Sequence, residues 1–248
     1  MLRLTILGCA GSYPGPATAC SGYLVQGCGV TVALDLGPGT LANLQCHVGL
    51  GDLDAVVLSH SHPDHWVDLS GLMTAWRYTL GREGLAVYGT AETRQRVAGL
   101  MDDLEPTITW HDVTDGDQVT IGDLRLDFAA TVHYVETLAV RIGDGDASLA
   151  YSADTGPGWS FSAFPGDPVD LGLCEATSLA ADERDGFLHL SARQAGEMAR
   201  RAGVGQLVLT HLLPGGDPAD WQAEGSAAFG RPVSVARIHD AYRVGRAG

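Results

Sequence analysis

The sequence lacks several features that would assign it to common classes. No apolar run approaches the roughly 20 residues that cross a bilayer, and the first residues, MLRLTILGCAG, lack the long apolar segment of a secretory signal. We therefore expect a cytoplasmic protein with no membrane partner. Cysteine is also scarce, with five scattered residues and no Cys-x-x-Cys pair. This distribution predicts reduced thiols rather than disulfides or a thiolate metal site.

Positive charge is in short supply as well. Fifteen Lys and Arg residues stand against 30 Asp and Glu residues, which gives a formal net charge of −15. This balance argues against binding to long nucleic acids, which requires a basic surface. A small phosphorylated substrate is still compatible, because bound metal ions can supply the local positive charge. The acidity can also simply aid solubility.

The 248 residues, 45% of them hydrophobic, suffice for a sizeable core. No linker or low-complexity tract interrupts them, so we expect a single domain over residues 1–248. Apolar and β-branched runs predict strands at 2–7, 22–26, 30–36, 53–59, 85–88, 107–110, 118–121, 124–132, 137–142, 147–152, 171–175, 206–210 and 233–238. Helical spacing and end signals predict helices at 67–80, 91–101, 192–202 and 218–228, with Ser191 as an N-cap and Gly203 as a C-terminal stop. This order predicts an α/β fold, a four-layer αββα sandwich of two mixed β-sheets flanked by helices.

The segment VLSHSHPDHWVD at 57–68 is unusually rich in possible metal ligands, with three histidines and an aspartate within six residues. His60 and His62 are two apart in an extended loop, so their side chains can point the same way. Asp64 and His65 lie near the start of the following helix and turn toward a neighbouring point. One loop can therefore supply two metal ions. Imidazole and carboxylate ligands suit zinc, manganese or iron.

Three further residues of metal-ligand type follow apolar strands elsewhere in the chain. His133 follows LDFAATV, Asp154 follows SLAYSA and His211 follows QLVLT. A lone histidine after a strand is usually a hydrogen-bonded surface residue. Several such positions beside a His-x-His-x-Asp-His cluster favour a shared metal site instead.

At these residues the sequence resembles the metallo-β-lactamase fold superfamily. Within it, the chain is similar to the RNase Z-like phosphodiesterase branch, as a compact bacterial member without the tRNA-binding arm. The resemblance covers nearly the whole chain, through LTILGCAGS, LDLGPGT, SHSHPDH, His133, YSADT, CEAT, HLSARQAGEMA and LTHL. The metal pattern indicates the superfamily, and CEAT and HLSA indicate the branch.

The resemblance implies two divalent metal ions, zinc above all, with manganese or iron as alternatives. It assigns His60, His62 and His133 to one ion, Asp64, His65 and His211 to the other, and Asp154 to a bridge between them. It also implies that Asp35 holds the histidine loop by hydrogen bonds. A turn-forming role before Gly37 is the alternative for Asp35.

The same resemblance implies a mechanism. Two close divalent ions lower the pKa of a shared water, and the resulting hydroxide would attack phosphorus with Asp64 orienting it. His189 would protonate the departing alkoxide, with Glu175 beside it to raise its pKa. The alternative is a solvent-exposed His189 and an unrelated Glu175. Hydrolases of thioesters or β-lactams need no such acid, so this pair favours phosphodiester cleavage.

The substrate is expected to be small. Between 101 and 133 the chain offers only strands and short turns, without a basic arm that grips tRNA. The compact form resembles members that include cyclic-nucleotide phosphodiesterases, so cyclic AMP is our leading candidate. Trp159 and the segment LLPGGDP after His211 are the candidate substrate contacts. By analogy with the family, we expect a homodimer.

Other functions stay open from the sequence. An RNase Z-like ribonuclease is one, and a thioesterase, lactonase, arylsulfatase or β-lactamase-type hydrolase is another. A metal-binding protein without activity is the third.

Overall fold

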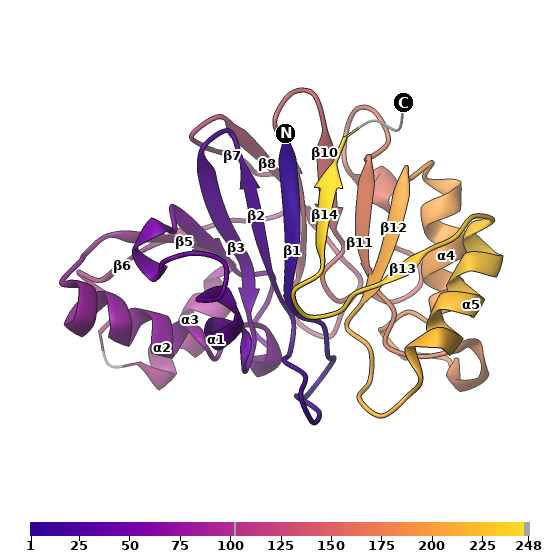
Figure 1. Cartoon of the computed structure of the whole chain (residues 1–248), viewed down its shortest axis with the longest axis horizontal. Helices are drawn as coiled ribbons and strands as arrows, with labels where there is room; N and C mark the ends of the chain where they lie inside the picture. Colours follow the sequence, from indigo (N-terminus) through magenta and orange to yellow (C-terminus); the bar gives the residue numbers. More distant parts are fainter. Residues whose placement is uncertain (102, 246–248) are drawn as a thin grey trace.

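The structure, a computed structural model, describes residues 1–101 and 103–245. Two mixed seven-stranded sheets pack face to face (Figure 1). The first sheet has the order β14-β1-β2-β3-β4-β5-β6. Its strands are β1 (Leu2–Gly8), β2 (Gly22–Gly27), β3 (Val30–Leu36), β4 (Ala55–Val57), β5 (Leu85–Gly89), β6 (Ile108–Asp112) and β14 (Ala241–Val244).

The second sheet has the order β13-β12-β11-β10-β9-β8-β7. Its strands are β7 (Gln118–Ile121), β8 (Leu124–Ala130), β9 (Leu138–Gly143), β10 (Ser148–Tyr151), β11 (Leu171–Glu175), β12 (Gln206–Thr210) and β13 (Ser234–Val235). The neighbours β10, β11, β12 and β13 run parallel, whereas β7, β8, β9 and β10 are joined antiparallel.

Helices cover the outer face of each sheet and complete the expected four-layer sandwich. The helices α1 (Thr40–Leu44), α2 (Leu69–Thr74) and α3 (Ala91–Leu100) lie beside the first sheet, and α4 (Ala192–Arg201) and α5 (Pro218–Phe229) lie beside the second (Figure 1). Ser191 caps α4 through a reciprocal capping box with Gln194. Gly203, at φ +72, follows its end in the left-handed conformation that stops a helix.

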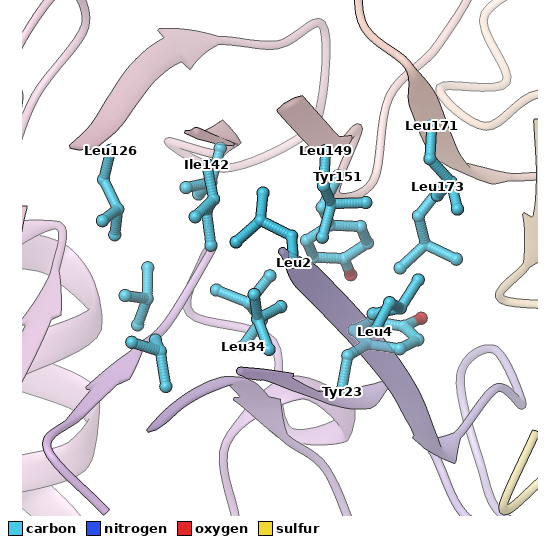
Figure 2. Packing of buried hydrophobic residues seen from close by; sticks show 14 of the residues in the cluster. Leu2, Leu4, Tyr23, Leu34, Leu126, Ile142, Leu149, Tyr151, Leu171 and Leu173 are labelled. Carbon is cyan, nitrogen blue, oxygen red and sulfur yellow. The ribbon is translucent and has the colours of Figure 1, made fainter. Parts of the chain in front are cut away.

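The main core lies between the two sheets. Figure 2 shows Leu2, Leu4, Tyr23 and Leu34 of the first sheet facing Leu126, Ile142, Leu149, Tyr151, Leu171 and Leu173 of the second. Side chains alternate along a strand, so in β1 Leu4 and Ile6 enter this core while Leu7 packs in the cluster that contains α2. Each sheet is thus buried on both faces, which explains why the strand sequences are almost continuously apolar.

The region expected as one helix over 67–80 is divided in the structure. The α-helix α2 ends at Thr74, and a π-helical turn follows over Ala75–Leu80. Two side chains of that turn are tied to neighbouring segments, Trp76 to the carbonyl of Leu50 and Arg77 to the hydroxyl of Thr107. Such tertiary contacts select a π turn that side-chain periodicity does not reveal.

Several strands end at one edge of the sandwich. Asp35 lies at the end of β3, and Ser59 and His60 follow β4. From the second sheet, β10 leads to Asp154 and β12 leads to His211. Loops from both sheets therefore meet there, held on rigid strands. No helix in the described part of the chain is both long and apolar enough to pass through a membrane.

Candidate metal centre

Residues 59–65, the histidine loop, contribute His60 and His62 to one half of a compact polar cluster, and His133 joins them there. His62 Nδ1 lies 3.1 Å from His60 Nε2 and 3.2 Å from His133 Nε2. The carboxylate of Asp154 closes this group, with Oδ2 at 3.7 Å from His60 Nε2 and 3.8 Å from His133 Nε2. These four side chains offer ligand atoms that could hold one metal ion.

Asp64, His65 and His211 form the second half. His211 Nε2 lies 3.3 Å from both His65 Nε2 and Asp64 Oδ2. Asp154 reaches this group too, with Oδ1 at 3.4 Å from His65 Nε2 and Oδ2 at 3.3 Å from His211 Nε2. Asp154 thus stands between the two groups of donors. The structure brings together all seven residues that the sequence suggested as ligands.

The protonation of the first group suits a cation. Burial and neighbouring histidines lower the pKa of His60 well below its usual range, and burial also lowers the pKa of His62 and of His133. Neutral imidazoles present lone pairs, and these face one another at close range. Among the described residues, buried Asp154 Oδ1 has no hydrogen-bond partner. A divalent cation would satisfy these atoms together, so the donor set fits a metal.

The second group is dominated by negative charge. Burial opposes ionisation of Asp154, but His211, His65 and His60 hold the pKa of its carboxyl well below its usual range. His65 is also buried, yet Asp154, Asp64 and Asp35 raise its pKa well above the ordinary value. Buried carboxylates need compensating positive charge. The carboxylates that stabilise a proton on His65 would stabilise a metal cation at its Nε2.

Asp35 fixes the histidine loop through the nitrogens that face away from the cluster. Its carboxylate accepts from the Ser59 amide and hydroxyl, both at 2.8 Å, from His65 Nδ1 at 2.8 Å and from the Tyr151 hydroxyl at 3.0 Å. Because Ser59 gives its one hydroxyl hydrogen to Asp35, it accepts from His60 Nδ1 at 2.9 Å. Both imidazoles are therefore held with Nε2 directed into the cluster.

His133 and His211 are also held through Nδ1. His133 Nδ1 donates to the carbonyl of Leu188 at 3.0 Å. His211 Nδ1 lies 2.9 Å from the Thr177 hydroxyl. Sequence reasoning did not single out Thr177, although it stands in the CEAT motif two residues after Glu175. Its role depends on the approach of His211 from a neighbouring strand, which the local sequence does not show.

Asp64 is positioned by Ser12, the last residue of the LTILGCAGS motif, whose contact with the site was not predicted. The backbone amide of Ser12 donates to Asp64 Oδ2 at 2.8 Å. Gly37 allows the backbone of Asp64 to come close, because a Cβ atom there would lie only 1.9 Å from the Asp64 carbonyl oxygen. The LDLGPGT segment thus supplies space for the loop as well as the carboxylate of Asp35.

Glu175 and His189 meet beside the cluster. Glu175 is fully buried, and its Oε1 accepts from His189 Nδ1 at 2.9 Å. Burial disfavours the charged imidazole, but the hydrogen bond and charge of Glu175 outweigh it and raise the pKa of His189 above its ordinary value. The His189 ring stacks on His211 at 5.5 Å, and its Nδ1 lies 4.0 Å from Asp154 Oδ2. Its side chain is only 12% exposed.

The Thr177 hydroxyl links this pair to the metal donors. Thr177 Oγ1 donates to Glu175 Oε2 at 2.9 Å and is oriented to accept from His211 Nδ1. Glu175 also accepts from the amides of Thr155, Thr177 and Leu190. Its carboxylate is therefore held rigidly, and it fixes His189 and His211 relative to each other.

Trp159, a candidate substrate contact from the sequence, is largely buried in the structure. It is 7% exposed and packs against Phe161 and Phe164 in the core beneath the second sheet's helices. The apolar residues that follow Asp154 serve packing, which a strand-end position alone does not distinguish from substrate contact. His47 and His239 lie outside the cluster and pair with each other at 2.9 Å.

Comparisons with known proteins agree with this geometry. A family model described as a beta-lactamase superfamily domain matches residues 31–212. The chain therefore belongs to the metallo-β-lactamase superfamily, as a metallo-hydrolase of its RNase Z-like branch.

Individual relatives match along nearly their whole length. An uncharacterized protein of Mycobacterium tuberculosis, Rv1339, is 36% identical, covering 100% of this chain and 94% of the relative. The probable metallo-hydrolase YhfI of Bacillus subtilis is 32% identical over 95% of this chain and 97% of the relative. A ribonuclease Z of Methanopyrus kandleri is 32% identical over 94% of each. The crystal structure of YhfI superposes with a TM-score of 0.90, covering 97% of this chain and 98% of that chain, and confirms the expected fold.

Proposed function

We propose that this protein is a dinuclear metal-dependent phosphodiesterase that acts on a small phosphodiester such as a cyclic nucleotide, with cyclic AMP the first candidate. The observation that carries the proposal is the Glu175–His189 pair at 2.9 Å, placed beside the metal donors. A phosphodiester leaves as a poor alkoxide, so its cleavage benefits from a nearby proton donor.

His189 has the geometry of that donor. Its Nδ1 is engaged by Glu175, so Nε2 is the atom left to deliver a proton to the leaving oxygen. The hydrogen bond and charge of Glu175 raise the pKa of His189, which favours the protonated form that a general acid requires. The stacked contact with His211 and the hydrogen bonds of Thr177 fix the ring beside the donor cluster.

The metal ligands in this proposal are His60, His62 and His133 for one ion, Asp64, His65 and His211 for the other, and Asp154 for both. Bound divalent ions, zinc first with manganese or iron as alternatives, would lower the pKa of a water and polarise phosphoryl oxygens. Asp64, held by the Ser12 amide, would orient the attacking oxygen. Asp35 keeps the histidine loop in place from behind.

The relatives support a phosphodiesterase but leave the substrate open. The ribonuclease Z relative carries the name of an enzyme that cleaves phosphodiester bonds, which favours the same chemistry here. The net charge of −15 disfavours a long RNA. The described residues between α3 and His133 form β6, β7, β8 and their connections, which supports a compact enzyme.

A substrate panel tests the proposal. Metal-free protein is reloaded with zinc, manganese or iron and assayed with bis-p-nitrophenyl phosphate, cyclic AMP, a short RNA, a thioester and nitrocefin. We expect turnover of the phosphodiesters, with the cyclic nucleotide preferred over RNA. Turnover of the thioester or nitrocefin alone would contradict the proposal. Preference for the RNA would favour the ribonuclease alternative.

A further inference from the structure

Several exposed apolar side chains are close in sequence to residues of the donor cluster. Among the described residues, four of the eight large apolar side chains that are exposed lie within two residues of a group that contacts the cluster: Tyr13, Val132, Tyr134 and Leu213. Exposed apolar surface beside a polar site commonly marks where a ligand binds. These four residues are therefore the candidates for apolar contact with part of the substrate.

Tyr134 differs from the others because its ring is both exposed and fixed. Tyr134 is 57% exposed. Its hydroxyl donates to the Gly186 carbonyl at 3.3 Å and accepts from the Leu188 amide at 3.1 Å. The Leu188 carbonyl in turn accepts a hydrogen bond from His133 Nδ1. The ring is therefore held at two ends, by the backbone after His133 and by the loop before His189.

The fixed ring stands next to the leaving-group acid. The ring centroid of Tyr134 lies 5.2 Å from that of His133 and 6.4 Å from that of His189. Phe187 packs against His189 on the same loop, at 5.1 Å, with the Arg184 guanidinium over the Phe187 ring. A ring exposed at this point would lie beside the group that departs with the proton from His189.

We propose that Tyr134 is a stacking platform for a nucleobase on the leaving group, so that the substrate is a phosphodiester of a nucleoside. The inference rests on the proposed phosphodiesterase function and deepens it. A phosphate at the His/Asp cluster and a base on the Tyr134 ring are joined by the ribose between them. Stacking uses the face that every base has, so the platform selects for the presence of a base rather than for its identity.

Two matched substrates measure this contribution in the metal-loaded enzyme. One is adenosine 3′,5′-cyclic phosphate, and the other is the methyl riboside 3′,5′-cyclic phosphate, in which a methoxy group replaces the base. We expect wild type to prefer the adenosine compound in kcat/KM. Tyr134→Leu should reduce that preference about 10- to 100-fold, the range that base stacking on an aromatic side chain supports.

Two variants separate stacking from loop support. Tyr134→Phe keeps the ring and loses both hydroxyl hydrogen bonds, so it should lower the rates for both substrates alike and keep the preference. Tyr78→Leu removes a tyrosine that is 76% exposed in the turn after α2, and it should leave rates and preference unchanged. An unchanged preference in Tyr134→Leu would overturn the inference.

A binding measurement keeps this test separate from the proposed function. Calorimetric titration with adenosine 5′-monophosphate, which has a base, and with ribose 5-phosphate, which has none, measures the contribution of the base to binding without turnover. Tighter binding of the nucleotide in wild type, lost in Tyr134→Leu, supports the platform. Equal binding of both compounds by wild type would overturn it. Failure of wild type to cleave any phosphodiester would instead contradict the proposed function.

Discussion

Asp35 and Glu175 are fully buried carboxylates, and each lies among several hydrogen-bond donors. A buried ionised carboxylate is stable only when such donors compensate for lost hydration. Asp35 belongs to the first sheet and orients His60 and His65. Glu175 belongs to the second sheet and orients His189, with Thr177 extending its reach to His211. Each sheet thus contributes one carboxylate that aligns the side chains above it.

The ion pair of Glu183 with Arg193 predicts that the stability of the fold depends on pH. Burial opposes the charge of Glu183, but Arg193 and Ser191 hold the pKa of its carboxyl below the ordinary value of 4.5. A depressed pKa adds stability above the ordinary value, and this is lost as pH falls through the folded value. Glu183→Gln should lower the free energy of unfolding by about 0.5–1 kcal/mol near neutral pH, since the pair is partly exposed.

Urea unfolding from pH 7 down to pH 3 checks this expectation. The difference between wild type and Glu183→Gln should shrink as the pH falls from 4.5 through the lower folded-state pKa of Glu183, because the carboxyl is then protonated. A difference that stays constant over this range would show that the carboxylate charge is not the source of the stability.

Loops rather than strands set the final geometry of the site. The segment Gly186–His189 approaches His133 closely, and Gly156 leaves the space for it. A Cβ atom on Gly156 would lie 2.9 Å from the Cα of Leu188 and 3.1 Å from its side chain. Leu188 therefore binds both His133 and Tyr134 only because position 156 has no side chain.

Gly156→Ala tests this approach. The methyl group should push Leu188 away and shift His133 and His189 together, because both are attached to the same segment. A displacement of about 1 Å in a catalytic group can cost roughly 100-fold in rate, so kcat/KM on a phosphodiester should fall by at least about tenfold. Gly99→Ala is the matched control, because a Cβ there meets nothing within 4 Å. Equal activity of the two variants would contradict the proposed role of Gly156.

Elements with a strong pattern were predictable from the sequence. The strands at 171–175 and 206–210 are found with those bounds as β11 and β12, and both are buried parallel strands bounded by turn residues. The helix α1 and the strand β14 were not anticipated. They have five and four residues, too few for a hydrophobic period to emerge, and tertiary pairing with β1 forms β14.

The same contrast holds in the site. His60, His62, Asp64 and His65 were found from local spacing, and Asp154 from its place after a strand. Ser12, Thr177, Tyr134 and Leu188 were missed, because each acts on a residue more than 30 positions away in the chain. Such contacts follow from the meeting of the two sheets, and no local pattern encodes them.

The whole molecule joins its two sheets at the donor cluster. His60, Asp64 and His65 follow strands of the first sheet, while Asp154 and His211 follow strands of the second. A cation bound to all of them would connect both halves of the sandwich. The extent of the domain, the homodimer, the identity of the metal and a cytoplasmic location stay predictions.

Metal binding should therefore stabilise the entire fold. Ligand binding at about 1,000 times its dissociation constant adds roughly 4 kcal/mol. For a chain of this size that corresponds to a rise in Tm of roughly 8–16 °C. Thermal unfolding of chelator-treated protein, with and without added zinc or manganese, measures the rise, and elemental analysis measures the bound metal. Asp154→Ala should lose most of both, whereas Asp112→Asn, altered at an exposed ion pair, should keep them. An equal rise in Tm for wild type and Asp154→Ala would contradict a site built around Asp154.

The proposal that His189 protonates a phosphodiester leaving group has a direct test. The rates of wild type and His189→Ala are compared on methyl p-nitrophenyl phosphate, which has a good leaving group, and on methyl phenyl phosphate, which has a poor one. His111→Ala, altered at an exposed histidine that stacks on Tyr88, serves as the control. We predict that His189→Ala lowers kcat about 10²–10⁴-fold on the phenyl ester and much less on the p-nitrophenyl ester, with the metal retained. Equal losses on both esters would contradict the assignment.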